Sequence, residues 1–360
     1  MPLYPLYALL FADTGLSEAE ISALFVVWSV SGVVAEIPSG ALADRFSRRS
    51  ALVAAGLLQA VGYLVWIVLP GFDGFAAGFV LWGIGGALAS GAFEALVHDG
   101  LAAAGAADRY AAVIGRSEAA GLAVQVPIAG VASAVFALGG YSLAGWVSVG
   151  TCLAAAALAA TLPDVRSGGP GSAAGEGGPG YRATLAAGLR EAAASPAVRG
   201  ALVAVAVLSG FDALEEYHAL LAADWGVPRG LVPLALFAIP LAGAAGAALG
   251  GRGARLRPAG LALAMLAGVA ALGAAGLAAR PGGLAGIVLF YGAWRMALVV
   301  ADARLQARIE GSARATVTSV AGVGAELVAT ALYGGWALGG LTLVTTAALL
   351  AAVLLPRRLR

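Results

Sequence analysis

Long apolar runs follow one another along almost the whole chain, separated by short polar or glycine-containing segments. A helix needs about 20 apolar residues to cross the hydrocarbon core of a bilayer. Eleven runs reach that length, and a shorter run at 2–12 precedes them. The full-length runs are 20–39, 51–69, 75–97, 111–138, 142–162, 198–221, 229–250, 259–279, 284–303, 313–334 and 337–355. Because 71–74 and 139–141 are turn-like, the runs beside them are expected to form hairpins. The pattern predicts an all-α, polytopic membrane protein.

The composition supports lipid as the solvent of this chain. Hydrophobic residues make up 61% and charged residues 11%, whereas a soluble domain carries roughly 25% charged residues. The net charge of +1 gives no reason to expect binding to nucleic acid. Cys152 is the only cysteine, which excludes an internal disulfide and a zinc cluster.

The arginines predict which side of the membrane each segment occupies. With twelve spans and both termini in the cytoplasm, eighteen of the 21 basic residues fall on cytoplasmic segments or the adjoining span ends. Only Arg229 and Arg280 fall outside, and Arg295 lies within a span. This bias follows the positive-inside rule. It predicts a multi-pass protein of the plasma (bacterial inner) membrane.

A Gly/Pro/Ser-rich segment at 163–181 divides the chain into two halves. Such a composition is typical of a flexible tether. We expect a six-helix bundle over 1–162, a cytoplasmic linker over 163–196 and a second six-helix bundle over 197–360.

The two halves resemble each other at an offset of 211 residues. Residues 9–15, LLFADTG, match 220–226, LLAADWG, and Gly40 and Gly251 each precede an arginine-rich segment. By this offset the first span should begin about thirteen residues before Met1. The first helix is therefore expected to be truncated, with a short but tolerated first helix as the alternative.

The most specific motif is GALADRFSRR at 40–49. It resembles the signature loop of the major facilitator superfamily, G-x-L-x-D-R-x-G-R-R, with Ser47 in place of a glycine. A carboxylate at a helix end can pair with arginine or with a helix N-terminus, so the motif is expected to act as a gating loop that latches the cytoplasmic side. Its residues are Gly40, Asp44, Arg45, Arg48 and Arg49. A plain positive-inside turn is the alternative.

The resemblance implies twelve spans in two repeats that rock around a central site. Two other family patterns are missing or weak. Phe79 stands where many proton-coupled members carry arginine, and the antiporter pattern of the fifth span survives only as Pro127 and Gly130. These motifs therefore fix neither proton coupling nor direction.

Ionisable residues concentrate on the spans that line the family's cavity. Charges within a membrane are costly and mark functional sites. On an α-helix, Asp212, Glu215 and Glu216 would share one face, with His218 on the same side. Arg295 can pair with Asp212 or Glu216, and Glu94 lies on the fourth span. Three carboxylates cannot all stay ionised cheaply in a low dielectric, so one of them is a candidate for proton coupling. One alternative is that Asp212 and Arg295 form a static ion pair between two helices. The other is that Glu216 and His218 are simply solvated near the outer mouth of the cavity.

Two tyrosines fall at equivalent positions in the first half. The repeat aligns Tyr4 with Glu215 and Tyr7 with His218, so both are expected to face the cavity. Aromatic rings beside carboxylates suit an amphipathic, cationic ligand. Placement in the interfacial aromatic belt is the alternative for both tyrosines.

These observations predict a secondary active transporter, with proton-coupled export of a small amphipathic compound favoured. Nutrient uptake or facilitated diffusion is the nearest rival, and a non-transporting receptor or scaffold is a rival of another class. No ATP-binding or catalytic motif is visible, so neither an enzyme nor a cofactor is expected. The expected partners are the substrate, protons and the bilayer, with a monomeric chain and no nucleic acid.

Overall fold

The computed structural model describes residues 1–163, 195–309 and 314–359. Within these ranges, the side chains of 37–46, of 314–316 and of a few residues between 91 and 126 are not described. Every regular element of the described residues is helical. The prediction of an all-α fold is therefore confirmed.

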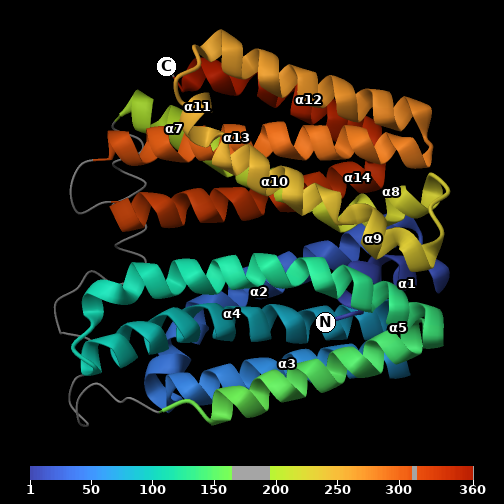
Figure 1. Ribbon diagram of the computed structural model, residues 1–360, viewed down its shortest axis with the longest axis vertical. Coiled ribbons are helices and arrows are strands. Elements are labelled where there is room, and N and C mark those ends of the chain that lie inside the picture. The colour runs from blue at the N-terminus through green and yellow to red at the C-terminus, as the bar shows by residue number, and fades with distance from the viewer. Residues whose placement is uncertain (164–194, 310–313, 360) are drawn as a thin grey trace. The chain divides into compact units, whose positions relative to one another are not determined.

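The contacts divide the chain into two compact units, Met1–Gly177 with Gly230–Leu234, and Gly178–Arg229 with Ala235–Arg360. We call them the N-terminal and C-terminal units (Figure 1). The N-terminal unit contains η1 (Tyr4–Leu6), α1 (Tyr7–Asp13), α2 (Glu18–Phe46), α3 (Arg48–Val68), α4 (Phe72–Ala103), η2 (Ala107–Arg109) and α5 (Tyr110–Ala160). Here α3 packs against both α4 and α5, and α2 packs against α4.

The C-terminal half begins with α7 (Pro196–Gly210), η3 (Phe211–Tyr217), α8 (His218–Asp224), η4 (Arg229–Leu231) and α9 (Val232–Leu236). It continues with α10 (Ala238–Ala248), α11 (Gly250–Gly253), α12 (Pro258–Ala278), η5 (Pro281–Gly283), α13 (Leu284–Arg308) and α14 (Arg314–Arg358). In the C-terminal unit α13 packs against α7, α10 and α12, and α14 packs against α7 and α12.

Within the described residues, nine helical segments are long and apolar enough to cross a membrane. Two of them, in α5 and α14, each contain two helices joined across a kink, at Gly139–Gly140 and at Gly340. Gly140 and Gly340 have φ of 60° and 54°, a backbone region that side chains disfavour. The hairpin expected at 139–141 is confirmed, as is the break between α3 and α4. The count of twelve spans stays a prediction.

The internal repeat is visible in local structure. Helices α1 and α8 occupy positions 211 residues apart, each follows a 3-10 turn, and each ends at a left-handed glycine, Gly15 with φ 93° and Gly226 with φ 90°. Both ends are Schellman motifs. In the first, the amide of Gly15 donates to Ala12 and that of Leu16 to Phe11; residues 211 positions later repeat both bonds. The offset read from the sequence is confirmed at these helix ends.

Candidate functional site

The first long helix of the C-terminal unit is interrupted where the predicted charge cluster lies. The α-helix changes to a 3-10 helix at Phe211 and resumes at His218. The sequence prediction assumed an unbroken α-helix, with three carboxylates on one face. In a 3-10 helix residues three apart eclipse each other, so Asp212 and Glu215 are aligned. Glu216 is turned away from them by about a third of a turn.

Two tertiary contacts fix the interruption. Gly210 is packed so closely against α14 that an added Cβ would lie 2.9 Å from the carbonyl oxygen of Ala325. The indole N–H of Trp294, on α13, donates to the carbonyl of Leu208 at 3.0 Å. In an α-helix that carbonyl accepts from the amide of Asp212. Trp294 therefore supplies a donor at the turn where the helix changes type.

Asp212 and Arg295 form an ion pair across this interruption. Nη1 of Arg295 donates to Oδ2 of Asp212 at 2.9 Å, and the two side chains are 33% and 40% exposed. The pairing expected from the sequence is confirmed. The second carboxylate oxygen of Asp212 is buried and has no hydrogen-bond partner among the described residues.

Tyr291 and a glycine of α10 complete the surroundings of Arg295. The guanidinium carbon lies 5.9 Å from the centroid of the Tyr291 ring, which permits a cation–π contact. An added Cβ at Gly243 would collide with that ring and would lie 3.4 Å from Cγ of Arg295. The small residue on α10 thus leaves room for Tyr291.

His218 is 3% exposed, and its Nε2 has no partner in the part of the chain that the structure describes. Its ring lies edge-on to Tyr291, with centroids 6.4 Å apart. Tyr7, its counterpart in the repeat, is likewise 3% exposed, and its hydroxyl also has no described partner. Buried polar groups are hydrogen-bonded in the great majority of cases, so both positions are unusual.

The other predicted residues of the C-terminal unit lie nearby along the chain but differ in exposure. Glu215 is exposed and Glu216 is half-buried, both within η3. Tyr217, between Glu216 and His218, is buried and stacks on Trp336 with centroids 3.9 Å apart. The interruption therefore presents one carboxylate to the surface while holding its aromatic neighbour in the core.

In the N-terminal unit, Tyr4 and Tyr7 occupy different environments. Tyr7 is buried among rings that include Phe11 and Trp66. Tyr4 is 41% exposed and lies parallel to Trp82, at 6.0 Å between centroids. Glu94, on α4, is exposed. Their expected position around a cavity between the halves stays a prediction.

The signature motif forms a helix end and not an extended loop. Helix α2 continues to Phe46 and α3 begins at Arg48, so Ser47 alone separates them. The side chains of Asp44 and Arg45 are not described, and neither are the surroundings of Gly40, so the latch expected of these residues stays a prediction. Ser47 has a φ of 125°, which explains why the family pattern has glycine there. Its hydroxyl accepts a hydrogen bond from the amide of Ser50 at 3.2 Å and caps α3.

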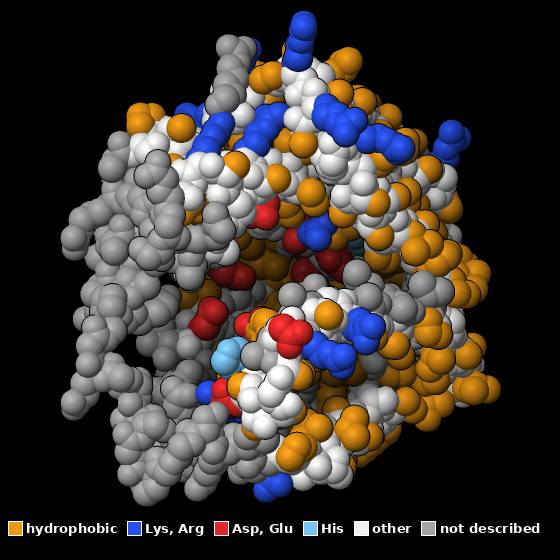
Figure 2. Space-filling view, turned by 60° about the vertical axis from the view of Figure 1, so that its left-hand side comes forward, with side chains coloured by type: hydrophobic (Ala, Val, Ile, Leu, Met, Phe, Trp, Pro, Cys, Tyr) orange, Lys and Arg blue, Asp and Glu red, His pale blue; other side chains and the backbone are white. Residues whose placement is uncertain are grey.

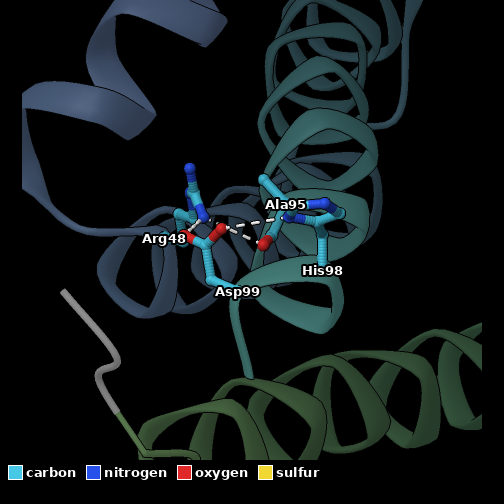
Figure 3. Close-up of polar contacts among 4 residues, drawn as sticks. All are labelled: Arg48, Ala95, His98 and Asp99. Atoms are coloured by element: carbon cyan, nitrogen blue, oxygen red, sulfur yellow. Dashed lines mark hydrogen bonds and ion pairs between the residues drawn. The ribbon is translucent and has the colours of Figure 1, made fainter. Parts of the chain in front are cut away.

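Arg48 links the start of α3 to the end of α4 (Figure 3). Its Nη1 pairs with the carboxylate of Asp99 and donates to the carbonyl of Ala95 at 2.9 Å. Nδ1 of His98 lies 3.3 Å from the other oxygen of Asp99. Arg49 donates to the carbonyl of Leu162 at 3.4 Å. No local sequence pattern relates Asp99 to Arg48, so sequence reasoning missed this pair.

The surface has the character of a membrane protein. Figure 2 shows hydrophobic side chains gathered along the right-hand side of the view and basic side chains mainly towards the top. Among the exposed arginines of the C-terminal unit, Arg252 lies in α11, and Arg255 and Arg257 lie between α11 and the start of α12.

Comparison with known proteins identifies the family. The sequence pattern of the Major Facilitator Superfamily matches residues 1–343. The chain is 31% identical over 162 residues to an "uncharacterized MFS-type transporter" found in two strains of Mycobacterium tuberculosis. This match takes in 45% of the chain and 38% of the relative, so it spans well under half of that protein's length.

Solved structures share the fold at low sequence identity. A bacterial homologue of the human lysosomal transporter Spinster, inward-facing and unoccupied, has a TM-score of 0.77 at 15% identity, covering 100% of this chain and 93% of its own. A D-xylose-proton symporter gives 0.70 at 16%, covering 96% and 89%. A mutant of the nucleoside transporter NupG gives 0.72 at 12%, covering 99% and 93%.

Proposed function

Because the chain belongs to the Major Facilitator Superfamily, we propose that it is a secondary active transporter that exports a small amphipathic compound in exchange for protons. In this family type, two halves rock against each other so that a midplane site opens to one side at a time. The sequence carries no ATP-binding motif, so an ion gradient is the proposed source of energy.

The observation that carries the proposal is the ion pair between Asp212 and Arg295 within the spans. A part-buried ion pair such as this one loses its attraction when one partner loses its charge, because the other charge is left without a counter-charge. Protonation of Asp212 removes the negative charge and releases Arg295. Proton uptake and opening of the pair would then be a single event.

The position of the pair allows this event to affect the backbone. Asp212 begins the 3-10 segment, and Arg295 follows directly after Trp294, which holds Leu208 at the same interruption. Discontinuous helices line the transport sites of many secondary transporters. Opening of the ion pair therefore frees α13 to shift relative to the break in the neighbouring helix.

The proposed substrate class follows from the groups around the pair. Tyr291 provides an aromatic ring beside Arg295, and Glu215 provides an exposed carboxylate. Such groups suit an amphipathic cation, through cation–π contact and charge pairing. The export direction rests on this aromatic content and on the family resemblance.

Purified protein reconstituted in vesicles that hold a pH-sensitive dye tests the proposal. We would add labelled tetraphenylphosphonium, then record proton flux and label together, with Glu215→Gln and Glu216→Gln in parallel. Substrate-dependent proton flux that a variant abolishes supports proton coupling. Label that equilibrates faster than in protein-free vesicles, with no proton flux, indicates facilitated diffusion. Proton and label that move in the same direction indicate uptake, and no movement of either favours the receptor or scaffold role.

A further inference from the structure

Helices α3 and α4 contact each other through a reciprocal pair of tryptophans and glycines. The indole of Trp66, on α3, lies where a Cβ at Gly78 would be, and the indole of Trp82, on α4, lies where a Cβ at Gly62 would be. The two tryptophan rings are 5.8 Å apart and nearly parallel. In this antiparallel hairpin the two residues are equivalent in packing.

They are not equivalent in hydrogen bonding. The indole N–H of Trp66 donates to the carbonyl of Phe75 at 3.0 Å. The indole nitrogen of Trp82 is buried, and the described residues provide it with no acceptor. Trp82 itself is 8% exposed, so this N–H is removed from bulk water.

Two tyrosine hydroxyls next to Trp66 are also buried without a hydrogen-bond partner among the described residues. Tyr63 is fully buried and Tyr7 is 3% exposed, and neither hydroxyl has a partner within the described part of the chain. Trp66 contacts all three rings, with centroids 5.6 Å from Tyr7, 5.4 Å from Tyr63 and 5.8 Å from Trp82. The three unpartnered groups therefore belong to one cluster, contributed by α1, α3 and α4.

A polar group that is buried without a partner costs about 1–3 kcal/mol. Such groups are rare and each calls for an explanation, and here three surround a single ring. Two of the three groups belong to Tyr7 and Tyr63. Phenylalanine would fill the same space at both positions and would lack only the hydroxyl oxygen. Their hydroxyls therefore indicate a hydrogen-bonding partner that is not among the described side chains of this unit.

We propose that Tyr7, Tyr63 and Trp82 bind a neutral, oxygen-bearing group of the transported compound, such as a ring hydroxyl or a carbonyl. An indole N–H only donates, so the atom facing Trp82 must be an acceptor. An ammonium group has no lone pair and cannot serve. The tyrosine hydroxyls both donate and accept, which suits a hydroxyl. Tyr4, which is 41% exposed, stacks on Trp82 beside this cluster.

This site differs from the ion-pair cluster in place and chemistry. It lies within the N-terminal unit and includes Tyr63 of α3, whereas the cluster around Asp212 lies in the C-terminal unit. No acidic or basic side chain takes part in the described ring contacts of the cluster. The inference rests on the proposed function only in assigning the bound group to a transported compound.

Equilibrium binding to the full chain in detergent, without a pH gradient, tests the site. The probe is phenyl β-glucoside, and phenyltrimethylammonium is its cationic counterpart with the same ring. Tyr63→Phe, Tyr7→Phe and Trp82→Phe each remove one polar group. Trp146→Phe is the control, because it removes the same ring volume as Trp82→Phe at a position that is 52% exposed and outside the cluster.

We expect each of the three variants to weaken glucoside binding about 2- to 12-fold, the range for one neutral hydrogen bond. Tyr63→Phe should leave the melting temperature unchanged or raised. Trp146→Phe should keep the affinity.

Three results would overturn the inference: no glucoside binding by the wild-type chain, equal affinity in wild type and Tyr63→Phe, or ammonium binding with the same sensitivity to these variants. Binding without a gradient is independent of proton coupling. If the chain binds the glucoside but moves no proton, the proposed proton-coupled transport is contradicted and the binding site inferred here is not.

Discussion

Arg295 of α13 donates a hydrogen bond to Asp212 of η3 at 2.9 Å, across 83 positions of sequence. Both residues lie within candidate membrane spans, and the pair sits at the interruption of the first long helix of the C-terminal unit. The ion pair thus links the continuous helix α13 to the interrupted helix formed by α7, η3 and α8.

Exchange of the two charges should restore part of what each single change removes. Asp212→Arg and Arg295→Asp each bring like charges together, so both are expected to lower transport and stability. The double variant re-forms a pair of opposite sign. A double-mutant cycle on vesicle transport should give a coupling energy of about 0.5–3 kcal/mol. Strictly additive losses would show that the contact is incidental.

Trp294→Phe should destabilise the protein by about 1–2 kcal/mol, because Leu208 loses its indole donor and the ring loses volume. Thermal unfolding in detergent measures the change. Trp146→Phe is the control, since Trp146 is 52% exposed. An equal shift for both variants would argue that the Leu208 bond does not support the interruption.

Ser47 provides a test in which two local effects oppose each other. Its φ of 125° is strained for a side chain, at about 1–3 kcal/mol. Replacing a Ser cap by Gly costs only a few tenths of a kcal/mol, whereas replacement by Ala costs about 1 kcal/mol. Ser47→Gly should therefore raise the melting temperature and Ser47→Ala should lower it. The opposite order would contradict the described geometry.

Asp99→Asn should change the rate of transport while membrane abundance stays near normal, if the contact with Arg48 belongs to a gate. The change removes the charge that faces Arg48 and His98. Asp108→Asn, at an exposed position of η2, is the matched control. Asp44→Asn tests the motif itself in the same assay. Transport rates that match wild type in both Asp44→Asn and Asp99→Asn would reject the latch.

The spans and hairpins were predictable because membrane crossing depends mainly on the length of an apolar run. The ion pair was also predictable, since opposite charges within spans have few alternative partners. The offset of 211 residues correctly related α1 to α8 because the same short pattern ends both helices.

The interruption between Gly210 and His218 was not predictable. The Ser209–Gly210 pair before it is a weak local signal of a helix kink, and the interruption also involves contacts of Gly210 with α14 and of Trp294 with Leu208. The rings that pack against Tyr7 from other helices, Phe25 of α2 and Trp66 of α3, were not predictable either, and its expected position at a cavity stays a prediction. Contacts between helices of this kind cannot be predicted from the pattern of hydrophobic and polar residues within one helix.

The central claim is that Asp212 couples proton movement to transport. The most direct test measures accumulation of a labelled amphipathic cation in inverted vesicles with an acidic interior, with the membrane potential clamped by valinomycin and potassium. Wild type should concentrate the label. Asp212→Asn should still exchange label across the membrane but should only equilibrate it, because the side chain can no longer take up and release a proton. Accumulation by Asp212→Asn at the wild-type level would contradict the account.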